Sequence, residues 1–317
     1  MAELNIAHER HGITIGSWPD GMPPDGKYYR DTAQHIERLG YDMIFCGDHI
    51  FHNAPLLECL TTLSHLAAVT ERVKIGSSVV LVPLRDPSIV AKEFATIDFL
   101  SGGRTIFGAG IGGEFEAEWN AVGVDRSTRG RRMDEYLNII KHLWSGEPVT
   151  FDGTYRQIPN VTLAPPPAQP GGPPVWIGGR SDAALRRASR FDGWVSYVSS
   201  PRRVRESVEK IREFSGGNLP DGFRIAMSLF FLIADTKEDA IIRGAKRLQG
   251  GYDQDFTQIL ESIGAVGTAD HVSARLEAYR EAGVQDFLWA PMAGAAEFRE
   301  QTERLAKLVG IGSLRNS

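Results

Sequence analysis

The sequence predicts an α/β protein: one closed (β/α)8 barrel spanning residues 1–317, with an insertion around residues 145–173. Two observations support this prediction. Short apolar runs with the character of strands alternate with longer helical patterns along the chain, and strict alternation implies parallel strands. Eight such units in roughly 300 residues fit a closed barrel better than an open doubly wound sheet, although periodicity alone does not distinguish the two.

Eight apolar runs are the expected strands. They cover residues 12–16, 41–46, 73–80, 104–110, 175–178, 193–197, 223–234 and 286–291. Helical patterns lie between most of these runs and after the last. They cover residues 28–39, 56–69, 87–100, 131–144, 181–190, 201–214, 237–248 and 271–282, with a further helix at the C-terminus.

Several of these elements carry clear sequence signals. Residues 28–39 place Tyr28, His35 and Leu39 on one helical face, and Gly40 follows as a helix stop. Pro87 suits the first position of its helix, because a missing N–H costs nothing there. Residues 145–173 break the alternation. They predict a loop with a hairpin around residues 152–153 and a proline-rich end, inserted within one domain because the alternation resumes at once.

The composition excludes two classes of partner. Lys and Arg number 35 against 40 Asp and Glu, a net charge of −5, and the sequence has no basic stripe of the kind that nucleic acid requires. The first 12 residues carry charges where a signal peptide needs an apolar core, and no apolar run approaches the roughly 20 residues of a membrane span. We therefore expect a cytoplasmic protein without a nucleic-acid or membrane partner.

The two cysteines, Cys46 and Cys59, form no disulfide framework and match no zinc spacing, so no metal site is expected. Cys46 stands in an apolar run and is expected to be a buried, unreactive thiol.

The barrel prediction directs the search for function to the C-terminal ends of the strands. Asp48 and His49 directly follow the strand at 41–46. A histidine side chain titrates near neutrality and can accept or donate a proton or bind a substrate. The alternative is a water-exposed histidine at a strand end, with Asp48 capping the next segment.

Two glycine-rich segments also follow expected strands. Gly110, Ile111, Gly112 and Gly113 come after the strand at 104–110, where glycines would let the backbone approach a flat ring or a phosphate. With Gly108 they match a dinucleotide fingerprint, but the acidic residue that this motif needs about 20 positions later is missing. A tight turn is the alternative.

The second segment, Gly178, Gly179 and Arg180, ends a strand and opens a helix at Ser181. Backbone N–H groups at a helix start and an arginine fork together suit a phosphate. The alternative is a loop in which Ser181 only caps the helix. By contrast, the composition around Ser78 and Val79 indicates no more than a strand that runs into a turn.

These segments, taken in order, resemble the luciferase-like monooxygenase superfamily, and especially its F420-dependent oxidoreductase branch. The resemblance spans nearly the whole chain. It lies in residues 39–49, 75–87, 106–112, 123–146, 174–179 and 192–194. It implies a barrel of the bacterial luciferase-like type, a homodimer, and an oxidoreductase that transfers a hydride between the deazaflavin coenzyme F420 and a small organic substrate. FMN is the alternative cofactor, used by monooxygenases of this superfamily with a partner reductase and O2.

The resemblance also implies roles for single residues. Asp48 and His49 would lie at the reactive face of the cofactor ring, with His49 as proton donor or acceptor. Ser78 and Val79 would be joined by a non-prolyl cis peptide bond behind the ring. The residues from Gly110 to Gly113 would contact the ring or the ribityl chain, and Gly178, Gly179 and Arg180 would bind the phosphate. The preference for F420 rests on Asp48–His49, the Ser78–Val79 context and residues 129–135.

The chain departs from the resemblance at one catalytic position. Some F420-dependent members have an acidic residue directly after their glycine motif, where this chain has Gly113, and Glu114 follows one position later. Glu114 is therefore a candidate acid or base that is displaced by one residue.

Two further functions were weighed. One is a barrel that binds a flavin or F420 without catalysis. The other is a sugar hydrolase, which needs two carboxylates facing one bond. Glu114 and Glu118 could share a helical face, but no second carboxylate at a strand end clearly pairs with Glu114. Loops 19–26, 50–55, 145–173 and 249–265 are expected to decide the substrate, and Trp18, Phe51 and Trp119 could either line its pocket or pack in the core.

Overall fold

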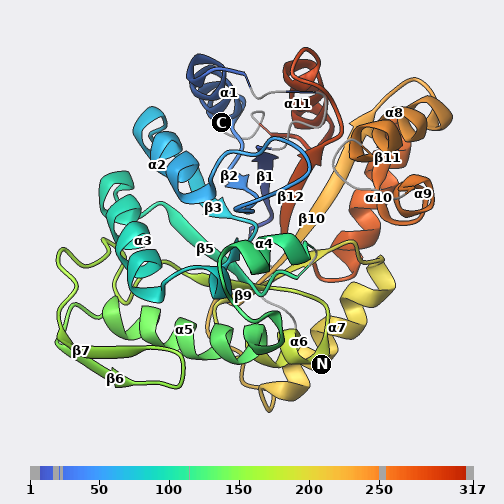
Figure 1. The fold of residues 1–317 in the computed structure, drawn as a ribbon. Helices are drawn as coiled ribbons and strands as arrows, with labels where there is room; N and C mark the ends of the chain where they lie inside the picture. Colours follow the sequence, from blue (N-terminus) through green and yellow to red (C-terminus); the bar gives the residue numbers. More distant parts are fainter. Residues whose placement is uncertain (1–7, 17–20, 22–23, 114, 250–254, 312–317) are drawn as a thin grey trace.

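The computed structural model describes residues 8–16, 21, 24–113, 115–249 and 255–311, and within them eight parallel strands close into a barrel (Figure 1). Each strand pairs in parallel with the next, and the last pairs with the first, which confirms the closed barrel. In order around the barrel the strands are β1 (Arg10–Ile15), β2 (Met43–Cys46), β3 (Lys74–Ser77), β5 (Thr105–Gly110), β8 (Val175–Gly178), β9 (Gly193–Tyr197), β10 (Arg224–Ile233) and β12 (Asp286–Pro291).

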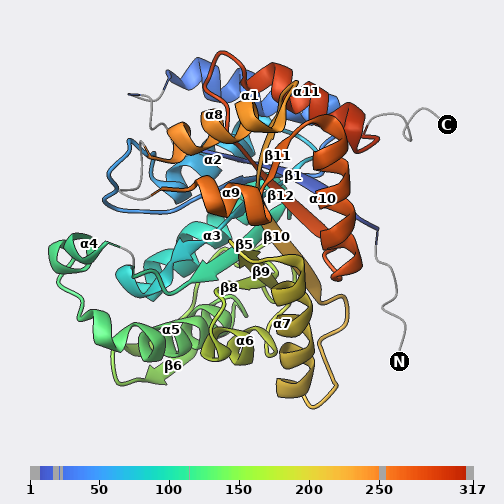
Figure 2. The same cartoon turned by 90° about the vertical axis from the view of Figure 1, so that its right-hand side faces the viewer.

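Helices surround the barrel on the outside (Figures 1 and 2). They are α1 (Gly26–Leu39), α2 (Cys59–Val69), α3 (Pro87–Ser101), α5 (Arg129–Leu143), α6 (Asp182–Ala188), α7 (Pro201–Phe214), α8 (Lys237–Gln249), α10 (Ala269–Glu281) and α11 (Phe298–Leu308). None of the helices in the described part of the chain is long and apolar enough to cross a membrane.

Local capping explains where the helices begin and end. The Asp25 carboxylate accepts a hydrogen bond from the Tyr28 N–H, and Gly40 ends α1 at a φ of 93°. Pro87 opens α3 as expected, with Asp86 as its cap. The helix predicted at 56–69 starts later, at Cys59, because the Glu58 carboxylate caps it through the Thr61 N–H.

The structure also corrects the sequence prediction after Ser77 and in the loop at 249–265. The strand predicted at 73–80 is interrupted: β3 ends at Ser77, and a short strand, β4 (Val80–Leu81), then pairs with β5. The loop predicted at 249–265 contains a helix, α9 (Thr257–Ile263), which leads into β11 (Ala265–Gly267) beside the end of β10. Short segments η1 (Val82–Leu84), α4 (Glu116–Ala121) and η2 (Arg126–Thr128) were also not predicted.

The insertion contains the predicted hairpin, with strands β6 (Val149–Asp152) and β7 (Gln157–Val161) lying beside α5 at the outer edge of the molecule (Figure 1). The Glu135 carboxylate of α5 accepts hydrogen bonds from the N–H groups of residues 154–156 in the hairpin turn. At the other end of the insertion, the N–H and side-chain amide of Gln169 donate to the buried Asp98 carboxylate. The insertion is thus fixed to the outside of the barrel.

Side chains fill the barrel interior and close its N-terminal end. Phe45 and Trp176 stack inside it with ring centroids 5.8 Å apart. At the N-terminal end, the fully buried Asp286 forms ion pairs with Arg10 and Arg224, each at 2.6 Å. Because the described residues pack this end shut, we expect a ligand to enter from the C-terminal ends of the strands.

Both cysteine side chains are buried and free, as expected for Cys46. Burial raises the pKa of both thiols, so neither is set up as a nucleophile.

Candidate active site

A cavity of about 440 Å³ opens at the C-terminal ends of the strands. That volume lies in the range of sites for small molecules and cofactors. Every site residue predicted from the sequence lines it, except for Glu114, which lies outside the described residues. These lining residues are Asp48, His49, Ser78, Val79, Gly110, Ile111, Gly112, Gly113, Gly178, Gly179 and Arg180.

The floor of the cavity is a bulge between β3 and β4. The peptide bond between Ser78 and Val79 is cis, as the resemblance implied. The Ser78 N–H donates to the Cys46 carbonyl at 2.7 Å, which ties the bulge to the end of β2. The side chain of Val79 projects against the ends of β5 and β8.

Glycines at those strand ends make room for the bulge. A Cβ on Gly110 would lie 2.4 Å from Val79 Cγ2, and one on Gly178 would lie 3.0 Å from Val79 Cγ1. A Cβ on Gly108 would lie 1.9 Å from the Ser77 carbonyl oxygen. Gly110 and Gly178 were predicted from the sequence to contact the ligand. In the structure, the absence of a side chain at these two positions first makes room for Val79. The Val79 side chain then presents an apolar surface to the cavity.

Asp48, just after β2, supports this bulge through the backbone of β4. Its carboxylate accepts hydrogen bonds from the Leu81 N–H at 2.9 Å and from Arg85 Nη2 at 2.5 Å. Arg85 also contacts Glu58 at 3.1 Å. Burial raises the pKa of Asp48, and the Arg85 guanidinium and the Leu81 N–H partly oppose that shift. Both oxygens are engaged below the cavity surface, so this carboxylate joins the bulge to the end of β2.

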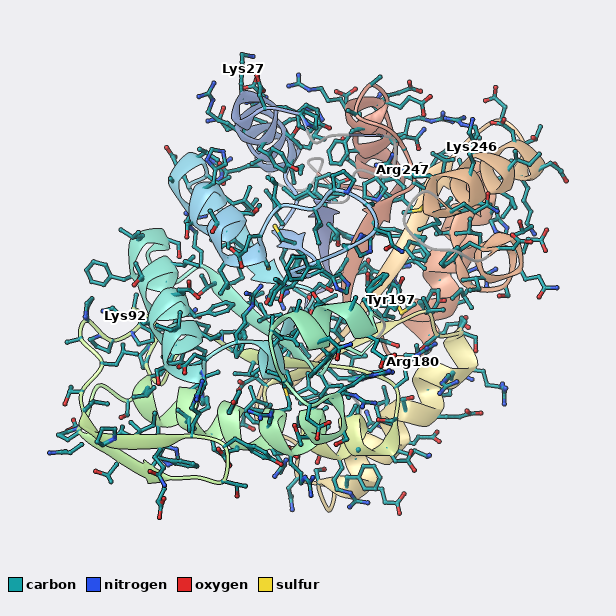
Figure 3. All side chains as sticks on the ribbon, viewed as in Figure 1. Lys27, Lys92, Arg180, Tyr197, Lys246 and Arg247 are labelled. Carbon is teal, nitrogen blue, oxygen red and sulfur yellow. The ribbon has the colours of Figure 1, made fainter. Side chains whose placement is uncertain are left out.

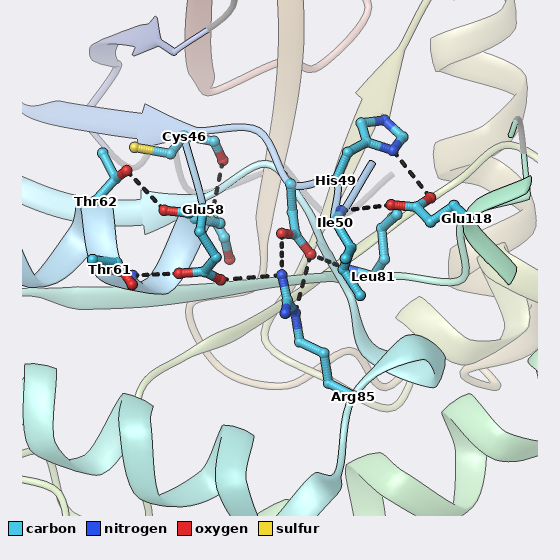
Figure 4. A network of polar contacts seen from close by, with 12 residues as sticks. Cys46, His49, Ile50, Glu58, Thr61, Thr62, Leu81, Arg85 and Glu118 are labelled. Carbon is cyan, nitrogen blue, oxygen red and sulfur yellow. Dashed lines mark hydrogen bonds and ion pairs between the residues drawn. The ribbon is translucent and has the colours of Figure 1, made fainter. Parts of the chain in front are cut away.

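His49, one residue later, turns to the cavity. Its side chain is 16% exposed, and its Nδ1 lies 3.2 Å from Oε2 of Glu118. Glu118 is on α4 and is only 1% exposed. Its other oxygen, Oε1, accepts hydrogen bonds from the N–H groups of Ile50 at 2.6 Å and Phe51 at 3.2 Å (Figure 4). A buried carboxylate thus binds both the imidazole and the backbone that follows it.

Glu118 was not predicted from the sequence as a residue of this site. Its position in the sequence suggested only a possible partner of Glu114 in a hydrolase. The available signal was a glutamate in a short helical turn directly after the glycine loop, one residue before Trp119.

Aromatic rings surround His49. Its ring centroid lies 4.9 Å from that of His52 and 5.1 Å from that of Phe115. His52 also lines the cavity. Of the three aromatic residues considered earlier, Phe51 is 54% exposed, Trp119 is buried against Leu81, and Trp18 lies outside the described residues.

The part of the cavity at the ends of β8 and β9 is basic. Gly179 adopts a φ of 122°, and the indole N–H of Trp194 donates to its carbonyl at 2.8 Å. Arg180 Nη1 donates to the Val198 carbonyl at 2.6 Å, which holds the guanidinium at the cavity rim. Figure 3 shows Arg180 and Tyr197 near one another on the β8–β9 side of the mouth, with Arg247 farther along toward α8. Ser181 caps α6 as expected, which is compatible with either earlier interpretation of this loop.

Several side chains of residues 129–135 connect α5 to neighbouring elements of the fold. The Arg132 guanidinium stacks on the Tyr155 ring, Asp134 forms an ion pair with Arg187 at 2.8 Å, and Glu135 caps the hairpin turn. Arg129, at the start of this segment, lies beside the glycine loop, since a Cβ on Gly113 would be 3.4 Å from its Nε. Within the described residues, no group of three or more His, Cys, Asp or Glu side chains is arranged to hold a metal ion.

Comparison with known proteins identifies the family. The protein-family model of the luciferase-like monooxygenases matches residues 11–286 of the sequence. The chain belongs to this family. An uncharacterized protein of Mycobacterium tuberculosis is 34% identical over 232 residues, which cover 63% of this chain and 80% of that protein. An FMNH2-dependent dimethylsulfone monooxygenase of Pseudomonas putida is 30% identical over 236 residues, or 72% of this luciferase-like chain and 64% of that enzyme.

Solved structures of luciferase-like enzymes show the same fold. The monooxygenase RslO1 of Streptomyces bottropensis matches with a TM-score of 0.84 and 21% identity, over 95% of this chain and 98% of its own. An F420-dependent secondary alcohol dehydrogenase, in complex with an F420–acetone adduct, matches with a TM-score of 0.82 and 17% identity, over 96% and 99%. At these identities the likeness is one of fold. The chain is thus a luciferase-like member of a superfamily of oxidoreductases and monooxygenases.

The fit between Val79 and its glycine neighbours predicts the effect of one added methyl group. Gly110→Ala should destabilise the protein by about 1–3 kcal/mol, since a Cβ at 2.4 Å from Val79 forces the bulge to shift. Urea unfolding measures this. Gly130→Ala in α5 is the matched control, because a Cβ there meets no atom within 4 Å. Equal unfolding midpoints for Gly110→Ala and the wild type would show that the bulge does not depend on this glycine.

Proposed function

We propose that this protein is an oxidoreductase that binds coenzyme F420 in the barrel-mouth cavity and transfers a hydride between F420 and a small organic substrate. The observation that carries the proposal is the convergence, in one cavity, of an apolar bulge, a basic rim and a buried acid–base pair. The residues fit such a cofactor. Val79, Ile111 and Val195 offer apolar surface to a flat ring, and Arg180 offers a cationic fork to a phosphate.

When bound, F420 would supply the hydride chemistry, and the protein would supply binding, orientation and a dry site. In this mechanism, Val79 and the glycine loop support the ring, while Arg180 and the Gly179 backbone hold the phosphate. His49 takes the proton that the substrate releases on oxidation, or returns it on reduction. Apolar side chains such as Leu56, Phe230 and Met292 line the remaining surface and limit access of water.

A second candidate is an FMN-dependent monooxygenase that uses a partner reductase and O2. The 30% identity to the FMNH2-dependent dimethylsulfone monooxygenase favours it, because that enzyme is nearer in sequence than the F420-dependent structure. We favour F420 because a histidine held by a buried carboxylate beside the ring suits a paired hydride and proton transfer. The third possibility, a protein that binds the cofactor without catalysis, predicts no turnover with any reducible acceptor.

Cofactor titration tests this choice. Purified protein titrated with F420 and, separately, with FMN should bind F420 more tightly, as followed by fluorescence quenching. Binding of FMN without binding of F420 would replace the proposal by the monooxygenase. F420 binding without turnover of any acceptor would support a non-catalytic binding protein.

The phosphate role of Arg180 predicts a separation of binding from folding. Arg180→Ala should weaken cofactor binding about 10- to 100-fold, the effect of losing one or two charged hydrogen bonds, while the urea midpoint changes little. The exposed Arg205 on α7 does not line the cavity, so Arg205→Ala is the matched control. A loss of stability as large as the loss of binding would contradict the phosphate role.

A further inference from the structure

We propose that Glu118 is the positioning residue of His49: it fixes the imidazole in the tautomer with the proton on Nδ1, so that Nε2 is the atom that exchanges a proton in the cavity. The catalytic use of Nε2 rests on the proposed function. The tautomer itself does not, because it follows from contacts within the protein.

The first step is the protonation pattern around the carboxylate. The Ile50 and Phe51 N–H groups can only donate, so Oε1 of Glu118 acts as an acceptor for both. Oε2 faces His49 Nδ1 at 3.2 Å. Because an ionised carboxylate only accepts hydrogen bonds, a bonded Nδ1 must be the donor. A neutral imidazole that donates through Nδ1 has its lone pair on Nε2, at the other side of the ring.

The second step is the rigidity of this pair. Glu118 is 1% exposed, so water does not compete for its oxygens, and the same carboxylate binds the backbone of two residues next to His49. Two ionisable side chains that face the ring are Glu118 from α4 and His52 from the same loop as His49. The Asp48 carboxylate is turned to Arg85 instead. Glu118 therefore sets both the orientation of His49 and its hydrogen-bonding state.

The third step is the consequence for chemistry. A histidine held through Nδ1 by a carboxylate acts as a base through Nε2, the logic by which an aspartate orients the histidine of a catalytic triad. Oxidation of a substrate then places a proton on Nε2, and the buried carboxylate stabilises the resulting imidazolium. Reduction returns that proton from the same atom.

The isosteric variant Glu118→Gln provides a sharp test. Its amide oxygen has to face the two backbone N–H groups, which leaves the amide NH2 facing His49 Nδ1. Nδ1 must then accept, and the proton moves to Nε2. The variant thus keeps the size and the loop contacts of Glu118 but reverses the tautomer.

Nitrogen-15 NMR of the imidazole rings reads the tautomer directly in the protein without added cofactor. The chain has 8 histidines, and His49→Gln identifies the signals of His49. At a pH where the ring is neutral, we expect the Nδ1–H form in the wild type and in the control Glu116→Gln, whose side chain is exposed on the same helix. We expect the Nε2–H form in Glu118→Gln. An Nε2–H wild type, or a tautomer that Glu118→Gln leaves unchanged, would overturn the proposal.

Kinetics with the cofactor that the titration identifies give the second readout. Glu118→Gln should lower kcat at least about 100-fold with a much smaller change in KM, and should alter the pH profile. A purely structural role would instead lower stability and substrate affinity and leave the pH profile unchanged. A reversed tautomer with normal kcat would reject the catalytic use of Nε2. Absence of F420 binding would refute the proposed cofactor without affecting the tautomer result.

Discussion

The side chain of Val79 needs space at the centre of the barrel mouth, and most of the site depends on how that space is provided. Gly110 and Gly178 supply it from two neighbouring strands, where a Cβ would approach Val79 to 2.4 Å and 3.0 Å. Cys46 and Asp48 hold the backbone on either side of the bulge through main-chain N–H groups. The end of β2, the bulge and the ends of β5 and β8 therefore form one unit.

Two buried carboxylates next to this unit, Asp48 and Glu118, have different partners. Asp48 faces Arg85 and the backbone of β4, and its charge is used to hold the floor of the cavity in place. The Glu118 carboxylate contacts the imidazole of His49, and this imidazole reaches the cavity. The adjacent residues Asp48 and His49, which look like one catalytic motif in the sequence, thus have different surroundings: Asp48 supports the bulge, and the His49 side chain reaches the cavity. Such a division is typical of sites built on strand ends, where the scaffold is rigid and the chemistry lies on the loops.

The barrel could be predicted from the sequence because each strand–helix unit is encoded locally, by an apolar run, a cap and a glycine stop. The cavity lining could also be predicted, since strand ends must meet at one face of a closed barrel. Only the family resemblance implied the irregular bond between Ser78 and Val79. The local sequence pattern does not predict the interruption after Ser77, because the position of Val79 is fixed by glycines on β5 and β8, about 30 and 100 residues away. Glu118 was missed for the same reason: its partner His49 is 69 positions earlier. The glycines at positions 110 and 178 suggested contact with a ligand, whereas in the structure they are required by the packing of Val79.

We propose that the bulge and the basic rim together orient one cofactor in this cavity. A crystal structure of the protein with F420 tests this most directly. We expect the deazaflavin ring against Val79, the phosphate at Gly179 and Arg180, and His49 Nε2 facing the space beside the ring. A cofactor whose phosphate lies away from Arg180, or whose ring does not touch Val79, would contradict it.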